Sequence, residues 1–219
     1  MSKKDLLIEI GLEELPARFV TDAIAQLETK VQKWFDEKKV GYADIQKYST
    51  PRRLAIVVKD VNEMQADTEE EAKGPAKKIA LDAEGNWSKA ATGFARGQGV
   101  SVDDIYFKEI KGVEYVHVTK FTKGQQVKEL LVELKDIITS LTFPKNMRWA
   151  NNDMRYARPI KWMIALFGNE VIPFSITNVE TGNTTIGHRF LGTKIEIAEP
   201  AQYEQKLEDQ YVIVDSEKR

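Results

Sequence analysis

The sequence predicts an α+β fold, with mixed or antiparallel sheets, packed amphipathic helices and a candidate second lobe. Two segments, 13–40 and 124–141, place apolar residues at helical spacing and therefore indicate long amphipathic helices. Two pairs of apolar segments joined by short turns, at 103–121 and 162–176, indicate β-hairpins. Hairpins favour antiparallel or mixed pairing over an all-parallel sheet, and the loose alternation of strands and helices fits the α+β class.

The first part of the chain predicts a strand, a long helix and a second strand. The apolar run at 4–10 predicts a buried strand. In the helix at 13–40, Pro16 suits the first turn and Gly41 is the predicted stop. Residues 50–61 predict a strand with alternate apolar side chains on one face. The apolar residues of the helix are Phe19, Val20, Ala23, Ile24, Leu27, Val31, Trp34 and Phe35.

The middle of the chain predicts an exposed connection followed by a turn and a short helix. The segment at 62–78, NEMQADTEEEAKGPAKK, lacks periodicity and contains an acidic cluster, which is typical of an exposed connection or sub-domain boundary. Gly85 predicts a turn with a positive φ. Ser88 is the predicted N-cap of a helix that ends at Gly97 or Gly99.

The C-terminal part predicts short elements. Strands are expected at 193–197 and 211–215, on either side of a helix at 200–210. Asp215 or Ser216 suits an N-cap, so we expect a helix to begin there and the chain to be a fragment of a longer protein. The predicted lobes are a main body of 1–62 with 162–219, a second lobe of 72–142 and a basic connecting segment of 143–161.

Composition excludes several classes of function. The 42% apolar and 30% charged content is that of an ordinary soluble globular protein. The absence of cysteine excludes disulfides, thiol catalysis and thiolate metal sites, and it suits a reducing cytoplasm. No signal peptide is evident, and no apolar run reaches the roughly 18 residues of a membrane span, so we expect a cytoplasmic protein without membrane contact. Because the net charge is −2, any affinity for nucleic acid must come from a local patch.

The motifs of nucleotide and metal sites are missing from the sequence. There is no Walker A pattern and no GxGxxG after a predicted strand, and the glycines of GFARGQG suit helix ends. The two histidines, His117 and His188, form no HExxH pair and no ligand cluster. We therefore expect no metal site in this chain.

The stretch FPKNMRWANNDMRYARPIKW, at 143–162, concentrates positive charge between aromatic residues. Its spacing is irregular and Pro159 disfavours a continuous helix, so we expect a loop. Arginine beside Trp and Tyr suits phosphate contact and stacking with RNA, whereas ion pairs within the protein are the alternative, which spacing alone favours. The bases of this stretch are Lys145, Arg148, Arg155, Arg158 and Lys161.

Further candidates lie outside that stretch. Arg52 and Arg53 precede a strand, where guanidinium groups suit phosphate or carboxylate. His188 and Arg189 lie in TTIGHRFLG, where the histidine has three interpretations: a structural residue, which is favoured, a ligand contact or a general base.

Seven blocks of the sequence resemble, in order, the N-terminal part of the beta subunit of bacterial glycyl-tRNA synthetase. The resemblance covers nearly the whole chain, from Leu6 to about Leu191. One block alone is weak evidence, whereas seven in order are strong. The blocks are LLIEIGLEELPARFV, STPRRLAIVV, KGPA, KAATGFARGQGV, FPKNMRW, RYARPIKWMIALFG and TIGHRFLG.

The resemblance implies a ligase of protein biosynthesis that joins glycine to tRNA(Gly) with ATP, through a glycyl-adenylate, as a tetramer of two alpha and two beta subunits (α2β2). It implies that the alpha subunit holds ATP, magnesium and glycine, and that the beta subunit binds tRNA. This chain lacks the class II Arg-x-Glu and Gly-x-Gly-Glu-Arg patterns and the class I KMSKS signature. We therefore expect no catalytic residues, no cofactor in this chain and no ligase activity by the chain alone.

The resemblance implies contacts with tRNA or the alpha subunit at basic positions. Two alternatives remain: a scaffold for the alpha subunit without RNA contact, and an editing-type hydrolase that uses His188 and nearby carboxylates. The second is disfavoured because a pocket for glycine, the smallest amino acid, excludes larger ones sterically. The candidates are Arg52, Arg53, Lys145, Arg148, Arg155, Arg158, Lys161, His188 and Arg189.

Overall fold

The computed structural model describes residues 2–219, which divide into two compact units. The first contains the residues up to Gln65 together with Gln125–Arg219, and the second is Ala66–Gly124. The predicted second lobe, 72–142, differs from this unit at both ends. Residues 125–142 belong to the first unit because their apolar side chains, such as Leu131 and Ile138, are buried in its core.

A mixed sheet is the centre of the first unit, so the predicted α+β class is confirmed. Its strand order is β2-β3-β1-β7-β10-β9, with β8 paired to β7. All these pairs are antiparallel except β10 with β7, which is parallel. The strands are β1 (Lys3–Leu12), β2 (Asp44–Thr50), β3 (Arg53–Asn62), β7 (Ile160–Phe167), β8 (Glu170–Val171), β9 (Ser175–Ile176) and β10 (Val179–Gly182).

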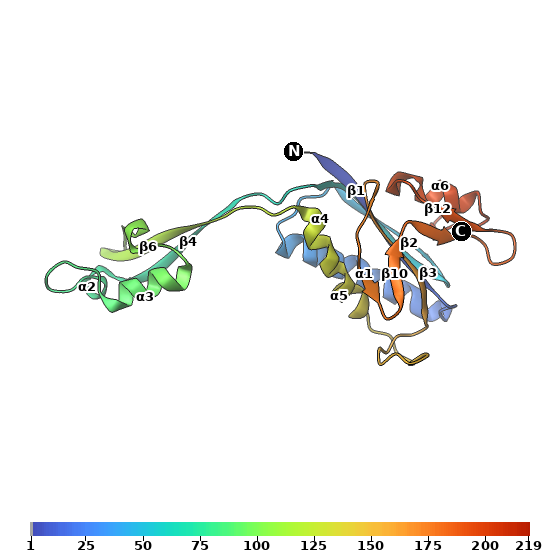
Figure 1. The fold of residues 1–219 in the computed structure, drawn as a ribbon, viewed down its shortest axis with the longest axis horizontal. Coiled ribbons are helices and arrows are strands. Elements are labelled where there is room, and N and C mark those ends of the chain that lie inside the picture. Colours follow the sequence, from blue (N-terminus) through green and yellow to red (C-terminus); the bar gives the residue numbers. More distant parts are fainter. Residues whose placement is uncertain (1) are drawn as a thin grey trace. The chain divides into compact units, whose positions relative to one another are not determined.

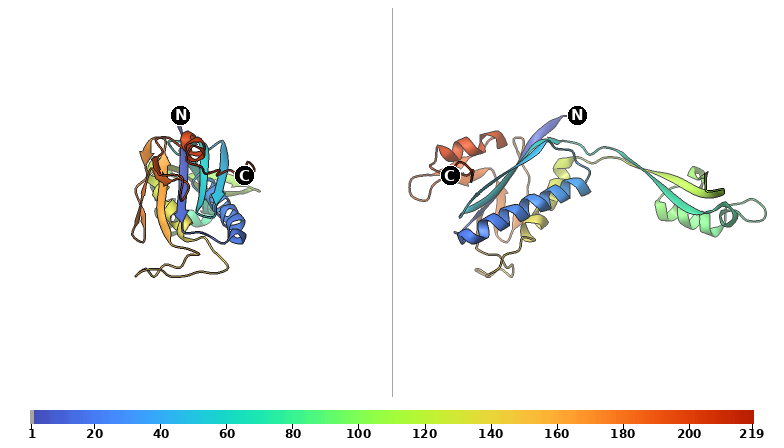
Figure 2. Two further views of the ribbon diagram at one scale, coloured as in Figure 1. Left: turned by 90° about the vertical axis from the view of Figure 1, so that its right-hand side faces the viewer. Right: turned by 180° about the vertical axis from the view of Figure 1, so that it is seen from behind.

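Helices cover one face of this sheet. In Figure 2, α1 (blue) and α5 (olive yellow) lie on the same side of the strands. The buried positions of α1 are the eight predicted from helical spacing, so that prediction is confirmed. They pack against Leu6, Ile8 and Ile10, because alternate side chains of a strand point to the same face. The helices are α1 (Ala17–Glu37), α4 (Val127–Leu130), η2 (Leu131–Glu133) and α5 (Leu134–Thr139).

The opposite face is covered by the C-terminal part of the chain, visible in red in Figure 1. Leu7 points to this side and packs with Tyr203 and Leu207 in a second core. The predicted strand at 211–215 is wrong: Val214 packs in this core, but the segment joins no sheet. The elements are β11 (Thr184–Ile186), β12 (Lys194–Glu196), η3 (Pro200–Gln202) and α6 (Tyr203–Glu208).

The second unit is a three-stranded antiparallel sheet, ordered β4-β6-β5, with short helices. The predicted hairpin is confirmed, and so is the cap of α3, where the Ser88 side chain accepts a hydrogen bond from the Ala91 N–H. The acidic segment is not merely a connection, because Glu71 lies on β4 and pairs with Lys108 at 2.8 Å. The elements are β4 (Thr68–Ala76), α2 (Lys77–Ala80), α3 (Lys89–Gln98), η1 (Val102–Asp104), β5 (Tyr106–Ile110) and β6 (Val113–Thr122).

Two predicted helix ends are also corrected. Helix α1 ends at Glu37, before the predicted stop at Gly41, and Lys39, with φ 53°, takes the left-handed conformation just after the helix. The predicted helix at 124–141 is divided by the 3-10 turn η2. Residues 216–219 form turns, although the Asp215 carboxylate accepts a hydrogen bond from the Glu217 N–H at 2.8 Å, as expected of an N-cap.

Candidate functional site

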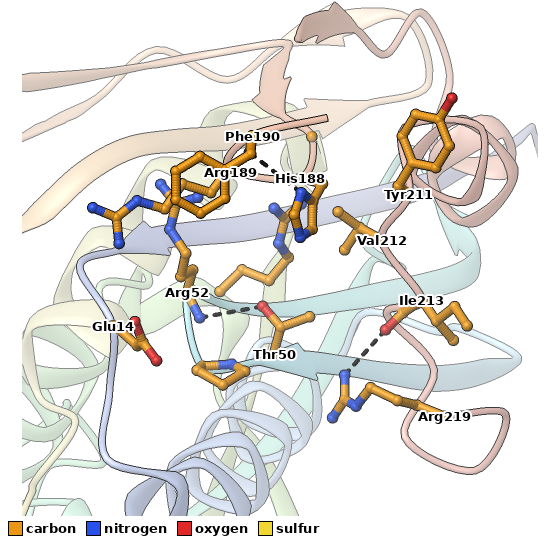
Figure 3. Close-up of a pocket in the computed structure, with 13 residues that line it drawn as sticks. Glu14, Thr50, Arg52, His188, Arg189, Phe190, Tyr211, Val212, Ile213 and Arg219 are labelled. Carbon is orange, nitrogen blue, oxygen red and sulfur yellow. Dashed lines mark hydrogen bonds between the residues drawn. The ribbon is translucent and has the colours of Figure 1, made fainter. Parts of the chain in front are cut away.

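A cleft of about 380 Å³ opens in the first unit, between the turn that joins β2 to β3 and the segments that follow β11 and α6. Figure 3 shows its two walls. Arg52 and Arg189 lie on one side, Val212 and Ile213 lie on the other, and His188 lies between them. One wall is therefore cationic, and the other is apolar except for Arg219, whose Nη1 donates to the Ile213 carbonyl at 3.0 Å.

Arg52 supplies uncompensated positive charge to the cleft. Its Cζ lies 5.8 Å from the centroid of the Trp162 ring, which supports the guanidinium by a cation–π contact. Burial, followed by the charges of Arg53 and Arg189, lowers the pKa of the Arg52 guanidinium. Within residues 2–219, neither Arg52 nor Arg189 makes a salt bridge. Two neighbouring arginines whose charges oppose each other favour a bound anion between them, and Glu14 offsets them only in part.

Arg53 is adjacent in sequence but buried beneath the cleft. Its side chain is 2% exposed, and its Nη1 lies 3.6 Å from the Glu9 carboxylate, which is fully buried. Arg53 Nη1 also donates to Thr185 Oγ1 at 3.3 Å, and Nη2 donates to the Ile186 carbonyl at 2.6 Å. These partners hold β11 against the sheet, so the observed role of Arg53 is to position the segment that follows.

That segment is the loop 187–192, and its own backbone fixes its shape. The Gly187 N–H donates to the Thr193 carbonyl at 2.8 Å, and the Gly192 N–H donates to the His188 carbonyl at 2.9 Å. A Cβ on Gly192 would lie 2.4 Å from the His188 nitrogen, so the turn requires glycine there. The sequence GHRFLG therefore encodes a tight loop.

His188 stabilises the tip of this loop. Its Nδ1 accepts hydrogen bonds from the N–H groups of Phe190, at 3.3 Å, and Leu191, at 3.2 Å. Because Nδ1 is the acceptor, the neutral imidazole has its proton on Nε2 and presents a donor rather than a base. Arg189 and Phe190 project from the tip, with the Arg189 Cζ 5.5 Å from the Phe190 ring centroid. This geometry suits ligand contact better than proton abstraction.

Two further predicted bases adjoin the cleft. Arg158 and Lys161 line a second hollow that shares Arg52 and Arg189. Lys161 forms an ion pair with Glu13 at 2.7 Å, whereas Arg158 Nε donates to the neutral Glu14 carbonyl at 3.1 Å. The charge of Lys161 is therefore offset in part, whereas Arg158 keeps its charge beside Arg52 and Arg189.

The structure separates the remaining three predicted bases from the cleft. Lys145, Arg148 and Arg155 are exposed on the irregular segment at 143–159 and line neither hollow. In the part of the chain that the structure describes, no hydrogen bond or ion pair is found for their side chains. The segment is held by the buried Tyr156, whose hydroxyl donates to the Ile138 carbonyl at 3.2 Å.

Sequence reasoning missed the aromatic and C-terminal residues of the cleft. Phe190 lies in the GHRFLG loop and lines the cleft. Its position beside Arg189, in a short turn bounded by two glycines, could have identified it as an exposed aromatic residue of the site. Tyr211, Ile213 and Arg219 gave no such signal, because they reach the cleft only through the packing of α6.

Other site types are not found in this structure. Among residues 2–219, no group of three or more His, Asp or Glu side chains is arranged to hold a metal ion. None of the helices in that range is long and apolar enough to cross a membrane.

The fold and the cleft define a class of α+β protein with a cationic, aromatic-edged cleft suited to a phosphate-bearing ligand. Comparison with known proteins gives the family. A family model described as glycyl-tRNA synthetase beta subunit matches residues 6–219. The chain belongs to that family, as the resemblance predicted, and it corresponds to an N-terminal part.

Curated relatives agree with this assignment. The chain is 61% identical over 215 residues to the glycine–tRNA ligase beta subunit of Bacillus subtilis (strain 168), covering 98% of this chain and 32% of that protein. It is 60% identical over 219 residues to that of Halalkalibacterium halodurans, covering 100% and 32%. It is 55% identical over 216 residues to that of Listeria welshimeri, covering 99% and 31%. The chain thus spans about a third of the length of these relatives.

Proposed function

We propose that this chain is a non-catalytic, tRNA-binding and assembly part of a glycine–tRNA ligase. The observation that carries the proposal is the pair of unneutralised arginines, Arg52 and Arg189, at the edge of the cleft. Guanidinium groups fixed by aromatic contacts suit phosphate, and the family membership supports tRNA as the source of that phosphate.

The proposed setting is an assembly of alpha and beta subunits that attaches glycine to tRNA(Gly). In it, ATP, magnesium and glycine are bound by the alpha subunit, and this chain contributes RNA contact and subunit contact. The relatives are glycine–tRNA ligase beta subunits, which supports this setting. The donor orientation of His188 supports a binding role over a hydrolytic one.

The proposal predicts salt-dependent binding of tRNA(Gly) that depends on the cleft. Removing two phosphate contacts with Arg52→Gln plus Arg189→Gln should weaken binding and flatten the slope of log affinity against log salt by about 2. The matched control is Arg148→Gln plus Arg155→Gln, which removes the same charge from exposed positions outside the cleft. Filter-binding titrations at several salt concentrations measure both slopes.

A salt slope for Arg52→Gln plus Arg189→Gln equal to that of the unsubstituted chain would refute the cleft as the phosphate site. A pull-down with the alpha subunit distinguishes the scaffold alternative. If the Arg52 and Arg189 changes abolish capture of the alpha subunit while tRNA affinity and its salt slope stay unchanged, the cleft is a protein interface. Pyrophosphate exchange that depends on glycine, measured with this chain alone, would refute the non-catalytic assignment.

A further inference from the structure

We propose that the cleft binds a single unpaired nucleotide of RNA, with its base against Phe190 and Tyr211 and its phosphate on Arg52 and Arg189. This inference rests on the proposed function and names the part of the RNA that the cleft recognises. It follows from the conformation of Tyr211, the exposure of Phe190 and the two unlike walls of the cleft.

Tyr211 occupies a backbone position that favours glycine. Its φ is 61°, in the left-handed region, and its N–H donates to the Glu208 carbonyl at 2.9 Å. The Val212 N–H donates to the Leu207 carbonyl, also at 2.9 Å. These two bonds form a Schellman motif at the end of α6, where glycine is the usual residue because a Cβ is strained there.

The Tyr211 side chain makes little contribution to the packing of the fold that would offset this strain. The residue is 65% exposed and belongs to none of the hydrophobic clusters among the described residues. Several non-glycine residues of the described part have a positive φ, and among them Tyr211 is the one that lines the cleft, where its exposed ring is available to a ligand.

Phe190 is exposed on a loop that is already ordered. It is 82% exposed, although the hydrogen bonds to His188 Nδ1 fix the backbone beside it. An aromatic side chain on a fixed backbone has only two side-chain torsions to lose when a partner covers it, which makes it an effective binding contact.

The two walls of the cleft match the two halves of a nucleotide. Val212 and Ile213 offer apolar surface to a base, and Arg52 and Arg189 offer charge to its phosphate. His188 presents its Nε2 donor between them. The volume of about 380 Å³ is that of a small-ligand pocket and not of a groove that holds a helix.

The stacking contact requires the nucleotide to be unpaired. In a duplex both faces of a base are covered by its neighbours, so a protein ring stacks only on bases of loops, bulges and ends. Stacking on aromatic side chains also tolerates any base, because every base has a π face. The cleft should therefore select unpaired over paired RNA and show weak preference among bases.

The test uses the 219-residue chain and two RNA probes. One is a single-stranded oligoribonucleotide with a central 2-aminopurine, and the other is a blunt-ended RNA duplex of the same phosphate number. Binding should quench 2-aminopurine fluorescence in the single strand. Phe190→Ala should weaken single-strand binding by about fivefold or more and leave duplex binding unchanged. The matched control, Phe121→Ala, removes a phenylalanine that is 58% exposed on β6 and should change neither.

Tyr211→Gly gives an independent readout. It should raise the melting temperature by about 2–4 °C, because the strain at φ 61° is relieved, and it should weaken single-strand binding. If Tyr211 had only a structural role, the substitution would not raise the melting temperature and weaken single-strand binding at the same time. Unchanged single-strand affinity in Phe190→Ala and Tyr211→Gly overturns the inference.

The failure of this inference differs from the failure of the proposed function. If Arg52→Gln plus Arg189→Gln weakens tRNA binding while the aromatic variants bind single strands normally, the phosphate site stands and the nucleotide pocket is refuted. If Phe190→Ala impairs capture of the alpha subunit and leaves both RNA probes unaffected, the tip is a protein contact and the nucleotide pocket is again refuted.

Discussion

Replacing Glu9 by glutamine leaves the Arg53 guanidinium buried without its counter-charge. The Glu9 carboxylate is fully buried and accepts hydrogen bonds from Thr185 at 2.6 Å and from Trp162 and Tyr203. Glutamine has the same size, so the substitution opens no cavity. Arginine remains protonated in proteins, so Arg53 cannot relieve the loss by releasing a proton.

The expected cost is about 3–5 kcal/mol, the range for removing one member of a buried ion pair. With a slope of about 2–3 kcal/mol per molar urea, the unfolding midpoint should fall by about 1–2.5 M. The measurement is urea unfolding followed by tryptophan fluorescence and far-ultraviolet circular dichroism. This loss is a large fraction of the roughly 5–15 kcal/mol by which domains are stable.

The control is a surface pair of similar chemistry. Lys33 and Glu37 lie 3.5 Å apart on α1 with side chains 74% and 62% exposed, so Glu37→Gln should cost no more than about 0.5 kcal/mol. Equal midpoints for Glu9→Gln and Glu37→Gln would refute the reasoning. Glu9→Leu combined with Arg53→Met should cost less than the sum of the two single changes, because no buried charge remains.

Three other perturbations test the packing, a cap and a buried hydroxyl. Gly11→Ala should cost about 1–3 kcal/mol in thermal unfolding, because its Cβ would lie 1.9 Å from the Trp162 ring; an unchanged melting temperature would contradict this. Ser88→Ala should cost about 1 kcal/mol by loss of the α3 cap and should speed amide exchange in that helix, with unchanged exchange as the opposing result. Burial raises the pKa of Tyr48 to about 12 and that of Tyr203 well above 10. Because the neutral hydroxyls are favoured in the folded state, the stability that they contribute is complete below pH 10 and is lost as the pH rises through the raised pKa values. Tyrosinate absorbance and circular dichroism should show alkaline unfolding, and Tyr203→Phe should shift it; tyrosine ionisation without unfolding would contradict the prediction.

The periodicity of apolar residues correctly predicted the elements whose structure depends on residues that are close together in the sequence. The apolar spacing of α1 predicted its buried face, because a helix repeats every 3.6 residues whatever it packs against. The hairpin of β5 and β6 was predicted because its strands adjoin in sequence. The strand predicted at 211–215 failed because Val214 packs over the Tyr203 face; the segment meets the edge strand β2 through the hydrogen bond from the Ser49 N–H to the Val214 carbonyl at 3.0 Å but forms no ladder with it.

The sequence predicted a set of basic residues for the candidate site, but it did not predict which of them lie in the cleft and which have other roles. Arg52 and Arg189 lie together in the cleft, whereas Lys145, Arg148 and Arg155 lie elsewhere. Phe190 and Tyr211 were not anticipated, because an exposed aromatic residue has no periodic pattern.

The sequence by itself determined the fold class, the faces of the main helices and the family, through short-range spacing and the order of seven motifs. Only the tertiary structure decided which of two adjacent arginines is available to a ligand. Arg53 is neutralised by Glu9 and donates a hydrogen bond to Thr185, whereas Arg52 keeps its charge beside Trp162. Whether a charge is free depends on burial and on partners that are distant in the chain: the counter-charge of Arg53 comes from Glu9 on β1, and its hydrogen-bond partner Thr185 is 132 positions away.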